Sequence, residues 1–243
     1  MCLRYRDLTP VTDRGLRSMF GAYVALGAQE DHHTQQRILR DRVLANMTEE
    51  EWDSVINVHL KGTFAPSRWA VAYWRERAKA GQPVSGRIVN TTSVSGIYGN
   101  PGQANYGAAK AGIAAFTNIV ALEVARYGVT VNAVGPVALT RMTEGLGPAP
   151  ETDEEREARA PHWIAPIVTW LCSEESAGVT GRVFEASGQT LAVAEGWVRG
   201  PSTTPIDDPT KIGPVVADLL ATARPNSGMN GEPGGGPQTM LNS

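Results

Sequence analysis

The chain has 243 residues, with 22 basic and 25 acidic side chains and a formal net charge of -3. This length is typical of one α/β domain, and the near balance of charge excludes the strongly basic surface that binds nucleic acid or an anionic membrane. We find no apolar run of the roughly 18 residues that a membrane span needs, and Met1 to Glu30 lacks the basic start and apolar core of a secretory signal.

The cysteines and histidines give no sign of a metal site. Cys2 and Cys172 lie far apart in the sequence and lack the spacing of metal ligands. The simplest interpretation is a reduced protein of the cytoplasm. His32 and His33 are adjacent, but no third ligand lies near them, so we expect solvated histidines and no bound metal.

The first predicted element is a long helix. Thr48 stands at the N-cap position, and Glu51 stands three residues later at the position of a capping box. We expect the helix to run almost to Gly81, with a bend near Gly62 or Pro66, because glycine and proline weaken a helix interior.

The central stretch of the chain predicts strand, helix, strand. Arg87–Thr91 is a short apolar run followed by a Ser/Gly-rich turn, which favours a buried strand. Ala104–Tyr127 is rich in Ala, Leu and Ile and is followed by Gly128, a typical helix stop. Val129–Val134 is a second β-branched run, broken by Gly135 and the proline after it. Strands joined through a helix of this length are expected to be parallel.

The rest of the chain predicts three more elements and a tail. We expect a helix over Pro161–Ser173, the last strand of the sheet over Gly181–Gly188, and an amphipathic helix over Pro209–Arg224. Pro225–Ser243 is rich in Gly, Pro and Asn and is predicted to be disordered.

One pair of side chains carries the first chemical signal. Tyr106 and Lys110 are four residues apart and share a helix face. An ammonium near a phenol favours the phenolate and so lowers the pKa of the tyrosine from about 10 toward neutrality, which makes a usable general acid or base. Ser93, thirteen positions earlier, can donate to a substrate oxygen held at that tyrosine. Taken alone, such a pair is more often an ordinary feature of a helix surface, and only its context favours catalysis.

That context resembles the short-chain dehydrogenase/reductase family. The matching segments, in chain order, are Val55–Phe64, Asn90–Ser93, Tyr106–Lys110 and Val131–Pro136. The resemblance runs from about Ile38 to Pro201. It implies an α/β fold with a Rossmann-like doubly wound parallel sheet. It also implies hydride transfer between NAD or NADP and the carbon of a secondary alcohol or ketone.

The resemblance also implies roles for individual residues. Tyr106 would exchange a proton with the substrate, Ser93 would stabilise the substrate oxygen, and Lys110 would bind the cofactor ribose. Asn57 would be the fourth catalytic residue and would hold a water that links Lys110 to solvent. Cofactor contacts are implied for Tyr106 and Lys110, for Pro136 after the second strand, and for Thr140 in the following loop. Val137 departs from the Pro-Gly that the family has at that point. The family also implies a homodimer or homotetramer.

Residues 1–37 do not follow the family pattern. A family member of full length begins with a strand and a Gly-rich turn that brings the cofactor pyrophosphate to a helix N-terminus, and neither is recognisable here. Gln35–Arg37 is what codons for Asn-Asn-Ala encode when they follow a cytosine and are read one nucleotide early. We therefore expect an out-of-frame remnant. The alternative is a short replacement segment with a weak helix around Leu16–Leu26. The predicted divisions are thus 1–37, the catalytic portion 38–201, and the extension 202–243.

Two segments in the last part of the match resemble one particular branch of this family. Pro166–Leu171 and Ala194–Pro201 resemble the hydroxyacyl-CoA dehydrogenase part of type 2 multifunctional β-oxidation enzymes and their free-standing bacterial relatives. This implies a small-molecule substrate of the 3-hydroxyacyl-CoA or steroid type. The alternative, from the pattern of residues 1–37, is an inactive truncated fragment or an oligomerising scaffold that lacks cofactor binding.

Overall fold

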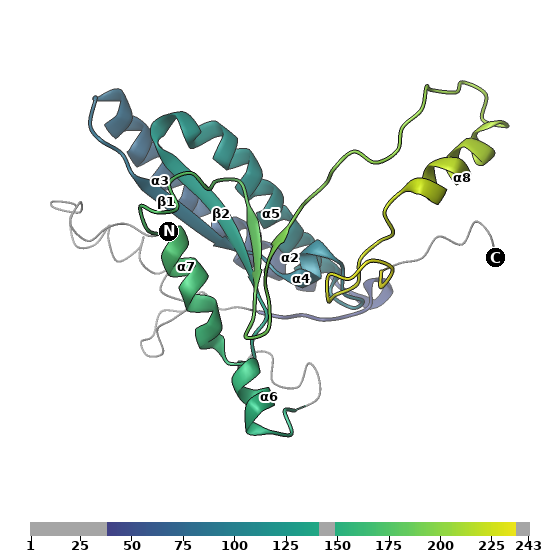
Figure 1. Cartoon of the computed structure of the whole chain (residues 1–243), viewed down its shortest axis with the longest axis horizontal. Helices are drawn as coiled ribbons and strands as arrows, with labels where there is room; N and C mark the ends of the chain where they lie inside the picture. Colours follow the sequence, from purple (N-terminus) through teal and green to yellow (C-terminus); the bar gives the residue numbers. More distant parts are fainter. Residues whose placement is uncertain (1–37, 141–148, 237–243) are drawn as a thin grey trace. The chain divides into compact units, whose positions relative to one another are not determined.

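The computed structural model describes residues 38–140 and 149–236 (Figure 1). The predictions made for residues 1–37, among them the out-of-frame segment and the two histidines, lie outside the described residues, as does the end of the predicted tail. The chain divides into two compact units, with the boundary between Ala194 and Glu195. This boundary falls seven residues before the predicted end of the catalytic portion at Pro201.

The first unit is built on a four-stranded sheet in the order β1-β2-β3-β4. The strands are β1 (Gly86–Thr91), β2 (Val129–Pro136), β3 (Val183–Ala186) and β4 (Leu191–Ala194). The first three are parallel, with Gly86 opposite Val129 and Ala133 opposite Val183. This confirms the predicted strand, helix, strand unit and the α/β class.

Helices cover both faces of this sheet (Figure 1). Side chains alternate along a strand, so Ile88 faces one core and Val89 faces the other. The first core lies under α3 (Gly62–Lys79) and α5 (Ala104–Val124), and the second lies under α7 (Ala165–Leu171). Because both faces are covered, β1 and β2 are buried along most of their length, as is usual for parallel strands.

The remaining helices of the first unit are short. They are α2 (Glu49–Ile56), α4 (Val94–Ile97), α6 (Asp153–Ala158), the 3-10 turns η3 (Leu44–Asn46), η5 (Ala125–Tyr127) and η6 (Pro161–Ile164), and the π-helical turn η4 (Asn57–Lys61).

The predicted long helix is interrupted by that π-helical turn. Thr48 and Glu51 form the predicted capping box, in which each side chain accepts from the backbone N–H of the other residue. The bond from the Thr48 backbone, with help from Arg42, holds the pKa of Glu51 below its usual value. The interruption stands immediately before Gly62, one of the two places where a bend was expected. The helix then ends as predicted, with Gly81 at a φ of 70°.

Helix α5 connects β1 to β2 and ends where the sequence predicts. Gly128 follows it at a φ of 73°, in the left-handed region that glycine adopts without strain. The sequence analysis found no apolar run long enough for a membrane span, and this needs correction. By length and composition alone, Ala104–Tyr127 is long and apolar enough to cross a membrane. The apolar side chains on one of its faces instead pack on the sheet, with Ile113 and Val124 fully buried. We therefore assign α5 as a core helix.

The sheet contains one strand that the sequence analysis missed. Gly181–Gly188 was expected to hold the last strand, but β4 follows β3 in an antiparallel hairpin. The hydroxyl of Ser187 accepts from the backbone N–H groups of Gln189 and Thr190. These bonds stabilise the turn between β3 and β4.

The second unit, from Glu195 onward, contains the predicted amphipathic helix as α8 (Ile212–Thr222). Beyond it, the described part of the predicted tail forms a tight turn. In this turn, Ser227 pairs with Pro233, and the N–H of Gly228 donates to the carbonyl of Glu232. The prediction of disorder therefore does not hold for this stretch.

Two glycines allow α4 to lie directly on α5. A Cβ at Gly96 would come within 2.5 Å of the backbone nitrogen of Ala111 and within 2.7 Å of the Lys110 Cβ. A Cβ at Gly107 would lie 3.1 Å from the Ser95 carbonyl oxygen. Neither glycine has a positive φ, so the requirement at both positions is for space.

We predict that Gly96→Ala destabilises the protein by about 1 to 3 kcal/mol, because the added methyl overpacks rigid backbone. Urea unfolding at neutral pH measures the change. Gly178→Ala is the matched control, since nothing lies within 4 Å of a Cβ there. A Gly96→Ala protein as stable as the control would contradict the close approach.

A tyrosine and a carboxylate link the end of α4 to the sheet. The Tyr98 hydroxyl donates to Glu185 Oε1 on β3. Burial, and then the hydrogen bond and the negative charge of Glu185, raise the pKa of Tyr98 from 10.0 to about 12. Between these two values the unfolded chain loses the phenol proton while the folded chain keeps it. The stability from this group is therefore complete below pH 10 and is lost as the pH rises toward 12.

We predict that the stability advantage of the wild type over Tyr98→Phe is constant up to about pH 10 and then shrinks toward pH 12. Urea unfolding of both proteins across this pH range measures it. In Glu185→Gln the decline should also begin near pH 10, where the unfolded chain loses the proton, but it should be smaller and end at a lower pH, because without the charge of Glu185 the folded-state pKa of Tyr98 lies closer to 10. An advantage that stays constant through pH 11.5 would rule out the raised pKa.

Candidate active site

The predicted site residues gather at one edge of the sheet. Since β1 and β2 are parallel, their carboxyl ends share an edge, which is where α/β proteins bind ligands. Ser93 follows the end of β1, and Pro136 is the last residue of β2. Helix α5 starts at the same edge, and its first two turns contain Tyr106 and Lys110.

The structure brings Tyr106 and Lys110 together as predicted from their spacing. Lys110 Nζ lies 5.6 Å from the centroid of the Tyr106 ring. The lysine is 5 % exposed, and its ammonium donates to the carbonyl oxygen of Thr91 at 2.9 Å. The end of β1 therefore fixes the position of the cation beside the half-buried phenol.

Ser93 is buried and stands at the N-cap of α4. Its hydroxyl oxygen accepts from the backbone N–H of Ser95 at 3.2 Å. This bond leaves the hydroxyl proton available as a donor, because the bond uses only an oxygen lone pair.

Buried hydrogen bonds hold α5 in register with β1. The Thr92 hydroxyl donates to the Lys110 carbonyl at 2.8 Å, and the Asn90 amide donates to the Thr117 hydroxyl at 2.9 Å. Together with the Gly96 contact, these bonds set the position of the helix along the strand. The Asn-Thr-Thr-Ser run of the sequence therefore has a structural task in addition to supplying Ser93.

The fourth predicted residue, Asn57, is exposed at the start of the π-helical turn. The residue of this turn that contacts Tyr106 is His59, with ring centroids 5.1 Å apart and an interplanar angle of 88°. The sequence analysis missed His59. A signal for it was present, because Val55 is fully buried and His59 lies four residues later, on the same face of a helix.

A short segment ahead of α2 is bound to the start of α5. Arg42 pairs with Gln103 in a parallel bridge, and the Gln103 amide donates to Asp41 at 2.7 Å. The fully buried Asn105 amide donates to the Arg40 carbonyl at 3.1 Å and to the Glu51 carbonyl at 3.2 Å. Segment 38–42 is thus fixed immediately beside Tyr106.

The remaining cofactor contacts implied by the resemblance lie after β2. Pro136 is half-buried and opposite Ala186 of β3, and the Val137 N–H donates to the Ala186 carbonyl at 2.9 Å. Thr140 is half-buried at the end of the described part of this loop. Their contact with a cofactor stays a prediction.

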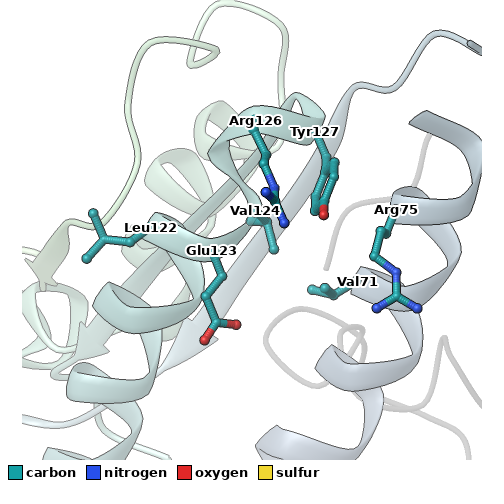
Figure 2. Close-up of a pocket in the computed structure, with 7 residues that line it drawn as sticks. All are labelled: Val71, Arg75, Leu122, Glu123, Val124, Arg126 and Tyr127. Carbon is teal, nitrogen blue, oxygen red and sulfur yellow. The ribbon is translucent and has the colours of Figure 1, made fainter. Parts of the chain in front are cut away.

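A cleft of about 400 Å³ lies at the far ends of α3 and α5 (Figure 2). It is lined by Val71, Arg75, Leu122, Glu123, Val124, Arg126 and Tyr127. A helix of 21 residues is about 31 Å long, so the cleft is nearly a helix length from Tyr106. We therefore do not assign it to the candidate active site.

Comparison with known proteins places this arrangement in a family. A family model described as enoyl-(acyl carrier protein) reductase matches residues 34–188. A hydroxyacyl-CoA dehydrogenase of Mycobacterium tuberculosis, ChsB1, is 42 % identical over 179 residues, which cover 72 % of this chain and 56 % of the relative. The peroxisomal multifunctional enzyme type 2 of Drosophila melanogaster is 40 % identical over 215 residues, which cover 85 % of this chain and 33 % of the relative.

A solved structure shows the same fold. The crystal structure of a short chain dehydrogenase from Mycobacterium avium matches with a TM-score of 0.69 and 50 % identity, over 78 % of this chain and 62 % of that one. This chain spans about half the length of the ChsB1 relative. The parallel sheet, the Tyr106 and Lys110 pair and these matches agree, and the chain belongs to the short-chain dehydrogenase/reductase family.

Proposed function

We propose that the protein is an oxidoreductase that transfers a hydride between NAD or NADP and the carbon of a secondary alcohol or ketone. The observation that carries the proposal is the phenol of Tyr106 beside the buried ammonium of Lys110, at the carboxyl edge of a parallel sheet. The name of one relative, hydroxyacyl-CoA dehydrogenase ChsB1, favours a hydroxyacyl-CoA substrate. The 3-hydroxyacyl-CoA or steroid-type substrate implied by the resemblance stays a prediction.

Each side chain has a defined task in this reaction. The Tyr106 hydroxyl exchanges a proton with the substrate oxygen, and Lys110 stabilises the negative charge on the phenol oxygen when its proton leaves. Ser93 donates to the same substrate oxygen and stabilises the charge that develops there. Asn57 was predicted to assist through a water, and it remains a candidate for that task.

The residues present fit the nicotinamide end of the cofactor. An ammonium has three N–H donors, so Lys110 can serve both Thr91 and the ribose hydroxyls. Pro136 and Thr140 would lie along the nicotinamide. A bound nicotinamide supplies the hydride donor or acceptor. In residues 38–85, the described part ahead of β1, no strand leads into a Gly-rich turn, so this fit concerns the nicotinamide end alone.

We also propose that the protein forms a homodimer or homotetramer through α3 and α5. Large apolar side chains on these helices are exposed, with Trp69 at 63 %, Ile119 at 56 % and Leu122 at 83 %. Covering such side chains favours association, since exposed apolar patches commonly mark interaction sites.

We predict saturable binding of NADH or NADPH to the purified chain, measured by nicotinamide fluorescence, and turnover of a 3-ketoacyl-CoA. Tyr106→Phe should keep cofactor binding but lose about 10² to 10⁴ in turnover, because it removes the proton that is transferred. Tyr127→Phe, at the other end of the same helical segment, is the matched control and should retain activity.

Absence of binding at millimolar concentrations of both cofactors would reject the proposed activity for this chain. It would favour the alternative function, an inactive fragment or an oligomerising scaffold. Binding with equal turnover in the wild type and Tyr106→Phe would reject the role of the tyrosine instead.

We predict that Leu122→Glu shifts the protein toward the monomer in size-exclusion chromatography with light scattering, because it places a charge in the proposed apolar interface. Leu44→Glu is the matched control, a leucine 67 % exposed that lies outside both helices. A wild type that is monomeric at micromolar concentration would reject the interface.

A further inference from the structure

Two side chains contact the ring of Tyr106, one through an imidazole and one through an ammonium. The imidazole of His59 meets it edge to face, with centroids 5.1 Å apart, in the range where such aromatic pairs attract. The ammonium of Lys110 lies 5.6 Å from the same centroid. The ring therefore has one neighbour from its own helix and one from the π-helical turn η4.

The imidazole is itself held by the backbone. His59 is 6 % exposed, and its Nε2 lies 3.0 Å from the carbonyl oxygen of Ile38. A carbonyl oxygen only accepts, so Nε2 has a proton and donates it in this bond. This bond ties the imidazole to Ile38, which belongs to the segment bound to the start of α5.

The π-helical turn is seated firmly against α5. A Cβ at Gly112 would lie 3.2 Å from the methyl carbons of Leu60, so the turn and the helix are in close contact there. The Thr63 hydroxyl donates to the His59 carbonyl at 2.8 Å, which gives that carbonyl a partner at the irregular step. Turns of this kind are frequent at functional sites.

We propose that His59 is a positioning residue for Tyr106, and that it sets the angle at which the phenol meets the substrate oxygen. The inference rests on the proposed function, in which Tyr106 exchanges the proton. The resemblance implied Asn57, which is exposed two residues earlier, as the fourth catalytic residue, whereas the side chain of this turn that contacts Tyr106 is His59.

The kinetic test compares His59→Ala, which removes the imidazole, with His59→Phe, which keeps an aromatic edge and loses the Nε2 donor. For His59→Ala we expect kcat to fall about 10²-fold, the cost typical of a misplaced reacting group, with the KM for cofactor within about twofold of the wild type. His59→Phe should recover part of kcat. Lys61→Ala, an exposed residue of the same turn, is the matched control.

A spectroscopic test needs no activity. In protein labelled with ¹³C at tyrosine Cζ, the Tyr106 signal among the six tyrosines is assigned by its loss in Tyr106→Phe. We expect His59→Ala to shift or broaden that signal and to leave the other five unchanged. His59→Phe should give an intermediate shift. Thermal melting of each variant identifies any that fail to fold.

Two results would overturn the proposal. One is a His59→Ala protein with an unchanged Tyr106 signal. The other is Asn57→Ala reproducing the fall in kcat while His59→Ala does not. If the wild type has no turnover, the proposed function fails, and the Tyr106 signal alone then tests the contact with His59.

Discussion

The position of α5 on β1 is the constraint on which the rest of the first unit depends. Gly96 lets the short helix α4 touch the backbone of α5, and the Thr92 hydroxyl fixes the same point of the helix through the Lys110 carbonyl. The Lys110 ammonium returns to the end of β1. The end of β1, the short helix α4 and the start of α5 are therefore held together by contacts of a few neighbouring residues. The three groups proposed for chemistry, Ser93, Tyr106 and Lys110, all belong to this tied stretch.

Much of this stretch could be predicted from the sequence because its signals are local. Gly128 stops α5 in the way that a glycine with positive φ does, and β1 and β2 are short β-branched runs between clear turn residues. The four-residue spacing of Tyr106 and Lys110 is enough to place both on one face of a regular helix. The parallel pairing then follows from the length of the connection.

The features that could not be predicted arise where regular periodicity fails or where contacts are distant in sequence. A π-helical turn has no clear signature in single residues. The resemblance implied Asn57 as the fourth catalytic residue, and the contact of His59 with Tyr106 emerged only from the structure. The strand β4 is four residues long and half exposed, too short for a distinct alternation. The bonds that fix segment 38–42 beside α5 join residues more than 50 positions apart.

The candidate site has one part whose geometry is set within α5 and another whose geometry depends on packing between elements. Substitutions that change this packing affect only the second part. Tyr106 and Lys110 are fixed to each other by one helix, and no substitution in the loops changes their spacing. Ser93 and His59 belong to other elements, which meet α5 through the close contacts at Gly96 and Leu60. Natural variation that loosens packing would therefore leave the tyrosine and lysine paired while it moves their neighbours. In relatives that diverge, we expect the first sign of functional drift at these contacts between elements, ahead of any change in the helix itself.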